Sequence, residues 1–204
     1  AASGVKRVVA VSSNSVTGAS TNKALVYNEG SQPDPHMAYG RSKLRMENIL
    51  DTAAKMHDFE VVTLKVPWFY GPNQPARQSQ FFSMIRNGSV PVVGAGDNLR
   101  SLAYVDEIAT ALILGASDSA SSGSKYWISD RKPYRYNEII ETIETVLEND
   151  FNIEVTHARL KLPSAFGNIT RVSDRLIQAF GFYNQKIHVA GELNMHIVCD
   201  PSLA

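Results

Sequence analysis

Two stretches decide the fold: RVVAVS at residues 7–12 and EVVTLKV at residues 60–66. Both are short and nearly continuous in valine and leucine, a composition typical of strands that are covered on both faces of a parallel sheet. Between them we predict a helix over residues 36–57, which gives the order strand, crossover, parallel strand. The sequence therefore predicts an α/β fold built on a parallel sheet.

Further segments lie within this unit and after it. The polar loop over residues 13–35 is long for a connection, and we interpret it as functional. The turn GAGDN at residues 94–98 contains two glycines but lacks a third and precedes a strand, so we predict a hairpin there instead of a dinucleotide loop. Residues 117–124 form a small polar linker. Helices are predicted near residues 78–87, over residues 106–116 with Asp106 as the cap, and over residues 136–147 and 163–180. Strands are predicted over residues 90–93, 100–105, 125–129 and 151–158.

The composition limits the possible partners. Of 204 residues, 44% are hydrophobic, and 20 basic residues balance 20 acidic ones. Since no basic stripe forms, nucleic acid and anionic membranes are not supported as partners, and a small-molecule substrate is favoured. Cys199 is the single cysteine, and no signal peptide or long apolar span is present, so we expect a cytoplasmic location. No metal site is predicted, because the histidines show no metal-ligand spacing with Cys199 or with paired carboxylates. They are His36, His57, His157, His188 and His196.

A candidate active site lies at the start of the first predicted helix. Tyr39 and Lys43 are four residues apart, so they stack on one helix face, and they follow the paired Ser12 and Ser13 at the end of the first strand. A free tyrosine has a pKa of about 10, and a nearby cation favours its phenolate, which can then act as a base or acid on a carbinol or carbonyl. The spacing alone is weak evidence, and a half-buried helix tyrosine beside a solvated lysine is the structural alternative.

The ordered motifs resemble a known family. Residues 5–16, Tyr39 to Lys43, LKVPWFYGP at residues 64–72, RSLAYVDEIA at residues 100–109 and DPSLA at residues 200–204 are similar, in the same order, to motifs of the extended short-chain dehydrogenases/reductases. These enzymes form the NAD-dependent epimerase/dehydratase group. The resemblance covers nearly the whole chain. It implies the C-terminal part of a Rossmann-like, doubly wound parallel sheet together with a small α/β substrate-binding region.

The resemblance also implies roles for single residues. Tyr39 is the catalytic acid/base, Lys43 holds the nicotinamide ribose and favours the phenolate, and Ser13 is the hydroxyl partner. The implied cofactor contacts are the backbone of Ser12 and the residues Pro67 and Trp68, and the implied substrate contacts are Asn14, Phe69 and Arg100. Arg100 matches the position at which sugar-nucleotide enzymes hold a diphosphate, a suitable use of a guanidinium fork; a surface strand residue is the equally weighted alternative.

Several positions depart from the family pattern. Lys65 replaces the usual arginine, and Trp68 and Phe69 stand where sugar-nucleotide enzymes often carry asparagine. Aromatic residues make the pocket more apolar, which shifts weight toward relatives resembling hydroxysteroid dehydrogenases or dihydroflavonol reductases. The run from Ser13 to Ser15 lacks the Asp-Glu pair of dehydratases, so dehydration is disfavoured. The sequence therefore leaves two substrate classes open, a nucleotide sugar and a steroid-like or flavonoid-like alcohol.

The cofactor half of the family pattern is not in this sequence. No G-x-x-G-x-x-G follows a first strand, so the loop that cradles the cofactor phosphates is missing. We assign residues 1–72 to the C-terminal half of an NAD(P)-binding domain, to which residues 99–130 return, and residues 73–204 mainly to substrate binding. Because this loop is missing, we expect the isolated chain to bind NAD or NADP weakly and to be inactive. An exposed edge on residues 7–12 would favour a homo-oligomer.

Two functions of different classes follow. The first is an NAD(P)-dependent oxidoreductase or epimerase that uses Tyr39, Lys43 and Ser13. The second is a non-catalytic regulatory relative that keeps the fold. The intact serine, tyrosine and lysine set favours the first, because non-enzymatic relatives typically lose the tyrosine or the lysine.

Overall fold

The centre of the fold is a three-stranded parallel sheet with the order β1-β2-β7. The computed structural model describes residues 4–35, 37–166, 169–170, 173 and 192–204. Strand β1 (Arg7–Ser13) pairs in parallel with β2 (Glu60–Val66), and β2 pairs in parallel with β7 (Lys125–Trp127). The register places Ser13 beside Val66. The predicted α/β fold with a parallel sheet is confirmed.

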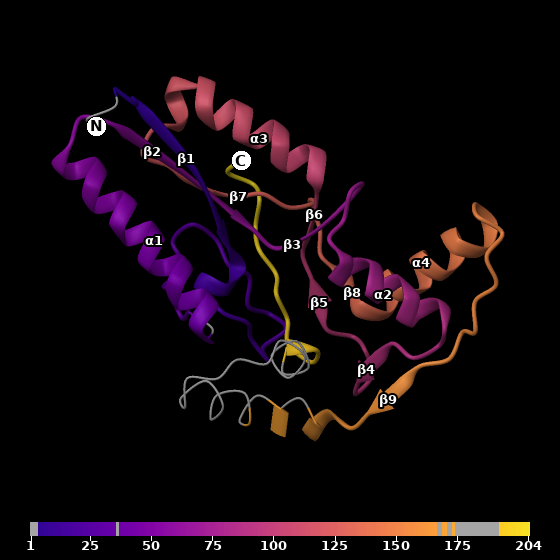
Figure 1. Ribbon diagram of the computed structural model, residues 1–204. Coiled ribbons are helices and arrows are strands. Elements are labelled where there is room, and N and C mark those ends of the chain that lie inside the picture. The colour runs from indigo at the N-terminus through magenta and orange to yellow at the C-terminus, as the bar shows by residue number, and fades with distance from the viewer. Residues whose placement is uncertain (1–3, 36, 167–168, 171–172, 174–191) are drawn as a thin grey trace.

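Two helices cover opposite faces of this sheet (Figure 1). Helix α1 (Met37–Met56) joins β1 to β2 as the predicted crossover, and helix α3 (Val105–Ser117) packs on the other face. Alternate side chains of a strand point to opposite faces, so the odd-numbered Thr63 and Lys65 face α1, whereas Val62 and Leu64 face α3. The short 3-10 helices η1 (Asn14–Val16) and η2 (Ser119–Ser121) follow β1 and α3, respectively.

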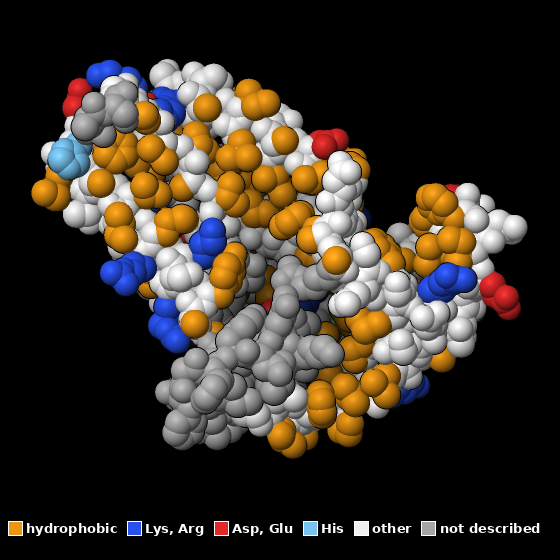
Figure 2. Space-filling model, in the orientation of Figure 1, with side chains coloured by type: hydrophobic (Ala, Val, Ile, Leu, Met, Phe, Trp, Pro, Cys, Tyr) orange, Lys and Arg blue, Asp and Glu red, His pale blue; other side chains and the backbone are white. Residues whose placement is uncertain are grey.

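Strand β1 forms one edge of the sheet, as predicted. Within the described parts of the chain it pairs with β2 alone. Val5 and Val11 are 47% and 38% exposed. Figure 2 shows hydrophobic side chains gathered on this side of the molecule, over the region between α1 and α3. An apolar edge strand is open to pairing with a further strand.

A second group of elements packs beside the sheet. Its core is apolar and includes Ile85, Val90, Val92 and Ile140. Parallel pairs join β3 to β6 and β4 to β9, and an antiparallel pair joins β5 to β8. The bounds are β3 (Trp68–Tyr70), α2 (Ala76–Arg86), β4 (Pro91–Val93), β5 (Leu99–Arg100), β6 (Leu102–Tyr104), β8 (Tyr134–Arg135), α4 (Tyr136–Asn149) and β9 (Leu160–Leu162).

The C-terminal segment connects the two groups of elements. Residues 192–204, yellow in Figure 1, run from the second group back to the sheet. His196 bridges to Ser20 in the long loop, Ile197 bridges to Arg100 in β5, and Cys199 bridges to Tyr27. This segment therefore ties the long loop that follows β1 to the second group of elements.

Three sequence predictions are wrong. The hairpin around residues 94–98 does not form, because β4 pairs with β9 and β5 pairs with β8. Asp106 does not cap α3; Tyr104 occupies the N-cap position and Asp106 lies in the first turn. The predicted strand over residues 151–158 is absent, since Asn152 and His157 have φ angles of 53° and 52°, which interrupt an extended chain. The predicted helix over residues 163–180 falls largely outside the described residues.

Candidate functional site

The carboxyl end of β1 presents the predicted Ser13. Its hydroxyl caps η1 by accepting a hydrogen bond from the Ser15 amide at 3.2 Å, and it donates to Asn14 Oδ1 at 3.4 Å. Ser13 is buried. The side chain of Asn14, a predicted substrate contact, thus lies beside the predicted hydroxyl partner. Carboxyl ends of parallel strands are where α/β folds bind ligands, so both residues stand at a suitable edge.

Helix α1 brings Lys43 next to Tyr39 and to β1. The Lys43 ammonium lies 6.0 Å from the centroid of the Tyr39 ring and donates a hydrogen bond to the Val11 carbonyl at 3.1 Å. Tyr39 is 48% exposed, so its phenol is accessible from outside. One lysine therefore contacts both the helix tyrosine and the strand that ends in Ser13.

A glycine lets α1 approach the end of β1. A Cβ at Gly40 would overlap the carbonyl oxygen of Ser15 and would lie 3.1 Å from the carbonyl carbon of Pro35. Since both atoms belong to the backbone, they cannot move aside as a flexible side chain can. Gly40 is therefore the residue that allows the turn carrying Tyr39 to pack directly on η1.

The side chain of Ser12 points toward α1. Its hydroxyl donates to Glu47 Oε1 at 2.5 Å, and both residues are buried. The predicted role of Ser12 was a contact to the cofactor through its backbone, and this side-chain contact leaves that prediction untested. Glu47 was not predicted as part of the site. Its position four residues after Lys43, on the same helix face, is the signal that could have identified it.

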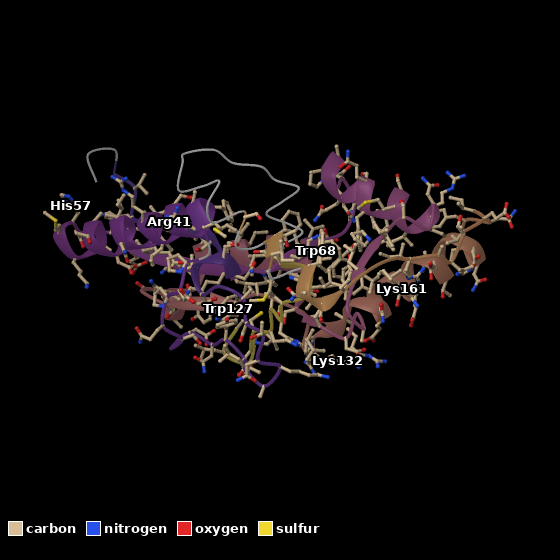
Figure 3. The ribbon with its side chains drawn as sticks, turned by 90° about the horizontal axis from the view of Figure 1, so that it is seen from below. Arg41, His57, Trp68, Trp127, Lys132 and Lys161 are labelled. Atoms are coloured by element: carbon tan, nitrogen blue, oxygen red, sulfur yellow. The ribbon has the colours of Figure 1, made fainter. Side chains whose placement is uncertain are left out.

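Pro67, Trp68 and Phe69 continue from the carboxyl end of β2. Because Val66 pairs with Ser13, these residues leave the sheet at the same edge as the serine. Pro67 is buried, and the Trp68 ring meets Phe81 at a centroid distance of 5.1 Å and an angle of 70°. Phe69 is 38% exposed, and its carbonyl accepts a hydrogen bond from Gln78. In Figure 3, Trp68 lies between the helix that carries Arg41 and the strand that carries Lys161.

Arg100 lies inside the second group of elements. It is 8% exposed, and its guanidinium donates to the Glu192 carbonyl at 2.5 Å. Burial lowers the pKa of Arg100, and burial raises the pKa of the nearby Tyr136 to about 12. The alternative that Arg100 is a surface strand residue is therefore wrong. The Nε of Arg100 has no hydrogen-bond partner among the described residues.

The structure thus brings part of the predicted set together. Ser13, Asn14, Tyr39 and Lys43 lie around the end of β1 and the start of α1, with Pro67 to Phe69 leaving the same sheet edge. Arg100 belongs instead to β5 and contacts the C-terminal segment. Among the residues that the structure describes, no group of three His, Cys, Asp or Glu side chains could hold a metal ion. None of the described helices is long and apolar enough to span a membrane.

Comparison with known proteins identifies relatives of this chain. The model of the NAD dependent epimerase/dehydratase family matches residues 1–129. Protein y4nL of Sinorhizobium fredii is 42% identical over 198 residues, which cover 97% of this chain and 56% of that protein. This chain therefore spans little more than half the length of that relative.

Solved structures show the same fold. dTDP-glucose 4,6-dehydratase from Bacillus anthracis, in complex with NAD, matches with a TM-score of 0.64 and 18% identity, over 92% of this chain and 60% of that one. UDP-N-acetylglucosamine 4-epimerase from Methanobrevibacter ruminantium, in complex with UDP-N-acetylmuramic acid, matches with a TM-score of 0.64 and 28% identity, over 78% and 50%. The Rossmann-like character of the predicted fold is confirmed by these likenesses.

Proposed function

Because the chain belongs to the NAD dependent epimerase/dehydratase family, we propose that it forms the catalytic part of an NAD(P)-dependent oxidoreductase acting on a nucleotide sugar. The observation that carries this proposal is the position of Lys43, 6.0 Å from the Tyr39 ring and hydrogen-bonded to the strand that ends in Ser13. In this proposal residues 1–72, to which residues 99–130 return, form the cofactor side of the site. Residues 73–204 form mainly the substrate side.

Each residue of the set has a role in moving one proton. The Tyr39 oxygen takes the proton of a substrate hydroxyl when the carbinol is oxidised and returns it when the carbonyl is reduced. The Lys43 ammonium lies beside the ring that carries this oxygen, 6.0 Å from its centroid. The Ser13 hydroxyl hydrogen-bonds the same substrate oxygen and keeps it in line with the phenol.

The residues at this edge fit the nicotinamide end of a cofactor. An accessible phenol, a lysine ammonium and a buried proline with an adjacent tryptophan supply polar and apolar contacts for a ribose and a flat ring. Tyr39 and Lys43 would hold the ribose, and Ser12, Pro67 and Trp68 would line the ring. When bound, NAD or NADP supplies the acceptor and donor of the hydride.

The test is Tyr39→Phe in the complete product of the gene. We expect turnover to fall by about 10²- to 10⁴-fold, the typical contribution of a general acid or base. We expect the free energy of unfolding to stay unchanged, because Tyr39 is 48% exposed. Steady-state kinetics with NAD and UDP-glucose or UDP-N-acetylglucosamine measure the change. Tyr126→Phe, the same change on the α3 side of the sheet, is the matched control. Unchanged turnover in Tyr39→Phe would remove this mechanism.

The contact between Trp68 and Phe81 favours a second class of substrate. An aromatic pair at the sheet edge suits a flat apolar alcohol of the steroid or flavonoid type. Titration of the protein with UDP-glucose and with a hydroxysteroid, followed by tryptophan fluorescence, separates the two classes. Trp127 is fully buried, so quenching that is lost in Trp68→Phe reports binding beside Trp68 alone. If only the steroid quenches the fluorescence, a steroid-like alcohol replaces the nucleotide sugar as the proposed substrate.

A further inference from the structure

Glu47 is a buried carboxylate in the middle of helix α1. It is 2% exposed, and it has partners on all three strands of the central sheet. Ser12 of β1 donates to Oε1 at 2.5 Å, while the ammonium groups of Lys125 in β7 and Lys65 in β2 lie 3.3 and 3.9 Å from Oε2. A buried charge is costly unless opposite charges and hydrogen bonds compensate it, and here both are present.

The register of the sheet explains why these partners converge. Ser12 pairs with Lys65, and Thr63 pairs with Lys125. Because alternate residues of a strand share a face, the side chains of Ser12, Lys65 and Lys125 all lie on the face that α1 covers. The Lys65 side chain is 4% exposed, and its ammonium lies 5.7 Å from a ring centroid of Trp127, which Figure 3 labels. Glu47 therefore lies over the polar side chains of this face of the sheet, Ser12, Lys65 and Lys125.

Three residues of α1 contact the short segment around Ser13. Gly40 packs on the Ser15 carbonyl, Lys43 donates to the Val11 carbonyl, and Glu47 accepts from the Ser12 hydroxyl. Their spacing of three and four residues places them on one face of the helix. The Gly40 and Lys43 contacts involve backbone atoms of the segment. The bond between Glu47 and Ser12 joins two side chains and adds a direction that simple packing lacks.

We propose that Glu47 is a positioning residue that aligns the helix carrying Tyr39 and Lys43 with the strand carrying Ser13. Lys65 and Lys125 balance its charge, and the Ser12 hydroxyl fixes its carboxylate relative to β1. The link to catalysis rests on the proposed function, but the alignment itself does not. A misplacement of about 1 Å between reacting groups can lower a rate about 10²-fold, so a contact far from the substrate can control turnover.

The alignment is measurable in this chain without catalysis. In a sample with ¹³C-labelled tyrosine, the ring signals of Tyr39 are assigned by their loss in Tyr39→Phe. We expect Ser12→Ala to shift these signals, because the helix loses its directional bond to β1 while every charge is kept. Asp51→Asn is the matched control: Asp51 lies one turn further along α1 and binds Lys125 at 2.8 Å, on the outer side of the network. Unmoved Tyr39 signals in folded Ser12→Ala would overturn the proposal.

Glu47→Gln gives a second test of the same alignment. The amide keeps the shape and an acceptor oxygen but loses the charge that Lys65 and Lys125 balance. We expect a larger shift of the Tyr39 signals than in Ser12→Ala. If this variant does not fold, Glu47→Gln combined with Lys65→Met removes one charge of each sign and restores the balance. Tyr39 signals equal to those of the parent in the folded double variant would contradict the assignment.

Kinetics separate this inference from the proposed function. In the complete gene product we expect Ser12→Ala to lower kcat at least about tenfold and to leave KM within about twofold, because the substrate contacts are intact. Asp51→Asn should leave both constants unchanged. A protein with moved Tyr39 signals but no turnover even before mutation would refute the proposed function and leave the positioning role standing. Moved signals with an unchanged kcat would overturn the positioning role.

Discussion

The two faces of the central sheet are covered by helices that pack in different ways. Helix α3 packs on Val62, Leu64 and Val66 through apolar residues such as Ile108. Helix α1 packs on the opposite face over Thr63 and Lys65, and it buries Glu47 there. Strand β2 thus presents valine and leucine to α3, whereas its α1 face carries the polar Thr63 and Lys65 beside Val61.

These two kinds of packing allow one sheet to combine stability with alignment. Apolar contacts are non-directional and depend mainly on the area removed from water, so the α3 face stabilises the sheet without fixing one helix position. Hydrogen bonds and ion pairs depend on distance and angle, so the α1 face specifies where the helix lies. The polar face is also the one that carries Tyr39 and Lys43. Alignment is therefore concentrated where we propose the chemistry to occur.

The largest expected effect comes from removing the buried carboxylate. Glu47→Ala leaves the Lys65 ammonium, whose side chain is 4% exposed, without its partner inside the protein. We expect the free energy of unfolding to fall by about 3–5 kcal/mol, the usual cost of breaking a buried ion pair from one side. Urea unfolding followed by circular dichroism measures it.

A double variant shows whether the polar face contributes stability or alignment. Glu47→Leu combined with Lys65→Met replaces the pair by apolar groups, and such replacements are often neutral or stabilising. We expect the double variant to recover most of the stability that Glu47→Ala loses. A double variant as unstable as Glu47→Ala would mean that the ionic network is the main source of stability on this face, which removes the contrast between the two faces.

The apolar strands of the sheet and the crossover helix could be predicted from the sequence. Periodic valine and leucine in residues 7–12 and 60–66, with a helix between them, are local signals, and they gave the crossover correctly. The polar contacts on the α1 face were missed, because in the sequence Glu47 looks like an ordinary solvated residue of a helix. Its burial depends on Lys65 and Lys125, which come from strands 18 and 78 residues further along the chain.

The errors in the second group of elements have the same origin. Residues 94–98 carry good turn residues, but the partner of β4 is β9, at residues 160–162. Nothing near residue 94 indicates a strand so distant. Likewise, the alternation over residues 151–158 suggested a strand, whereas Asn152 and His157 have positive φ angles and the segment contacts α4. His157 and Arg159 both contact Glu144 of that helix.

A glycine on the polar face gives a smaller expected effect. In Gly40→Ala the new methyl group meets the backbone of Ser15 and Pro35, so either α1 or the end of β1 must shift. We expect a loss of about 1–3 kcal/mol, the usual range for overpacking, despite the better helix propensity of alanine. Thermal unfolding measures the loss. A variant as stable as the parent would show that α1 is free to move on this face.

The matching glycine on the apolar face gives the smallest effect. In Gly115→Ala the new methyl group would lie 3.3 Å from one methyl of Val9 and one of Val62, which are side-chain groups able to move by a few tenths of an ångström. Alanine also favours a helix over glycine by up to about 1 kcal/mol, so the two terms oppose each other. We expect the stability to change by less than about 1 kcal/mol in either direction, measured under the same conditions as Gly40→Ala. A loss as large as that of Gly40→Ala would show that α3 is held as rigidly as α1, and alignment would then not distinguish the two faces.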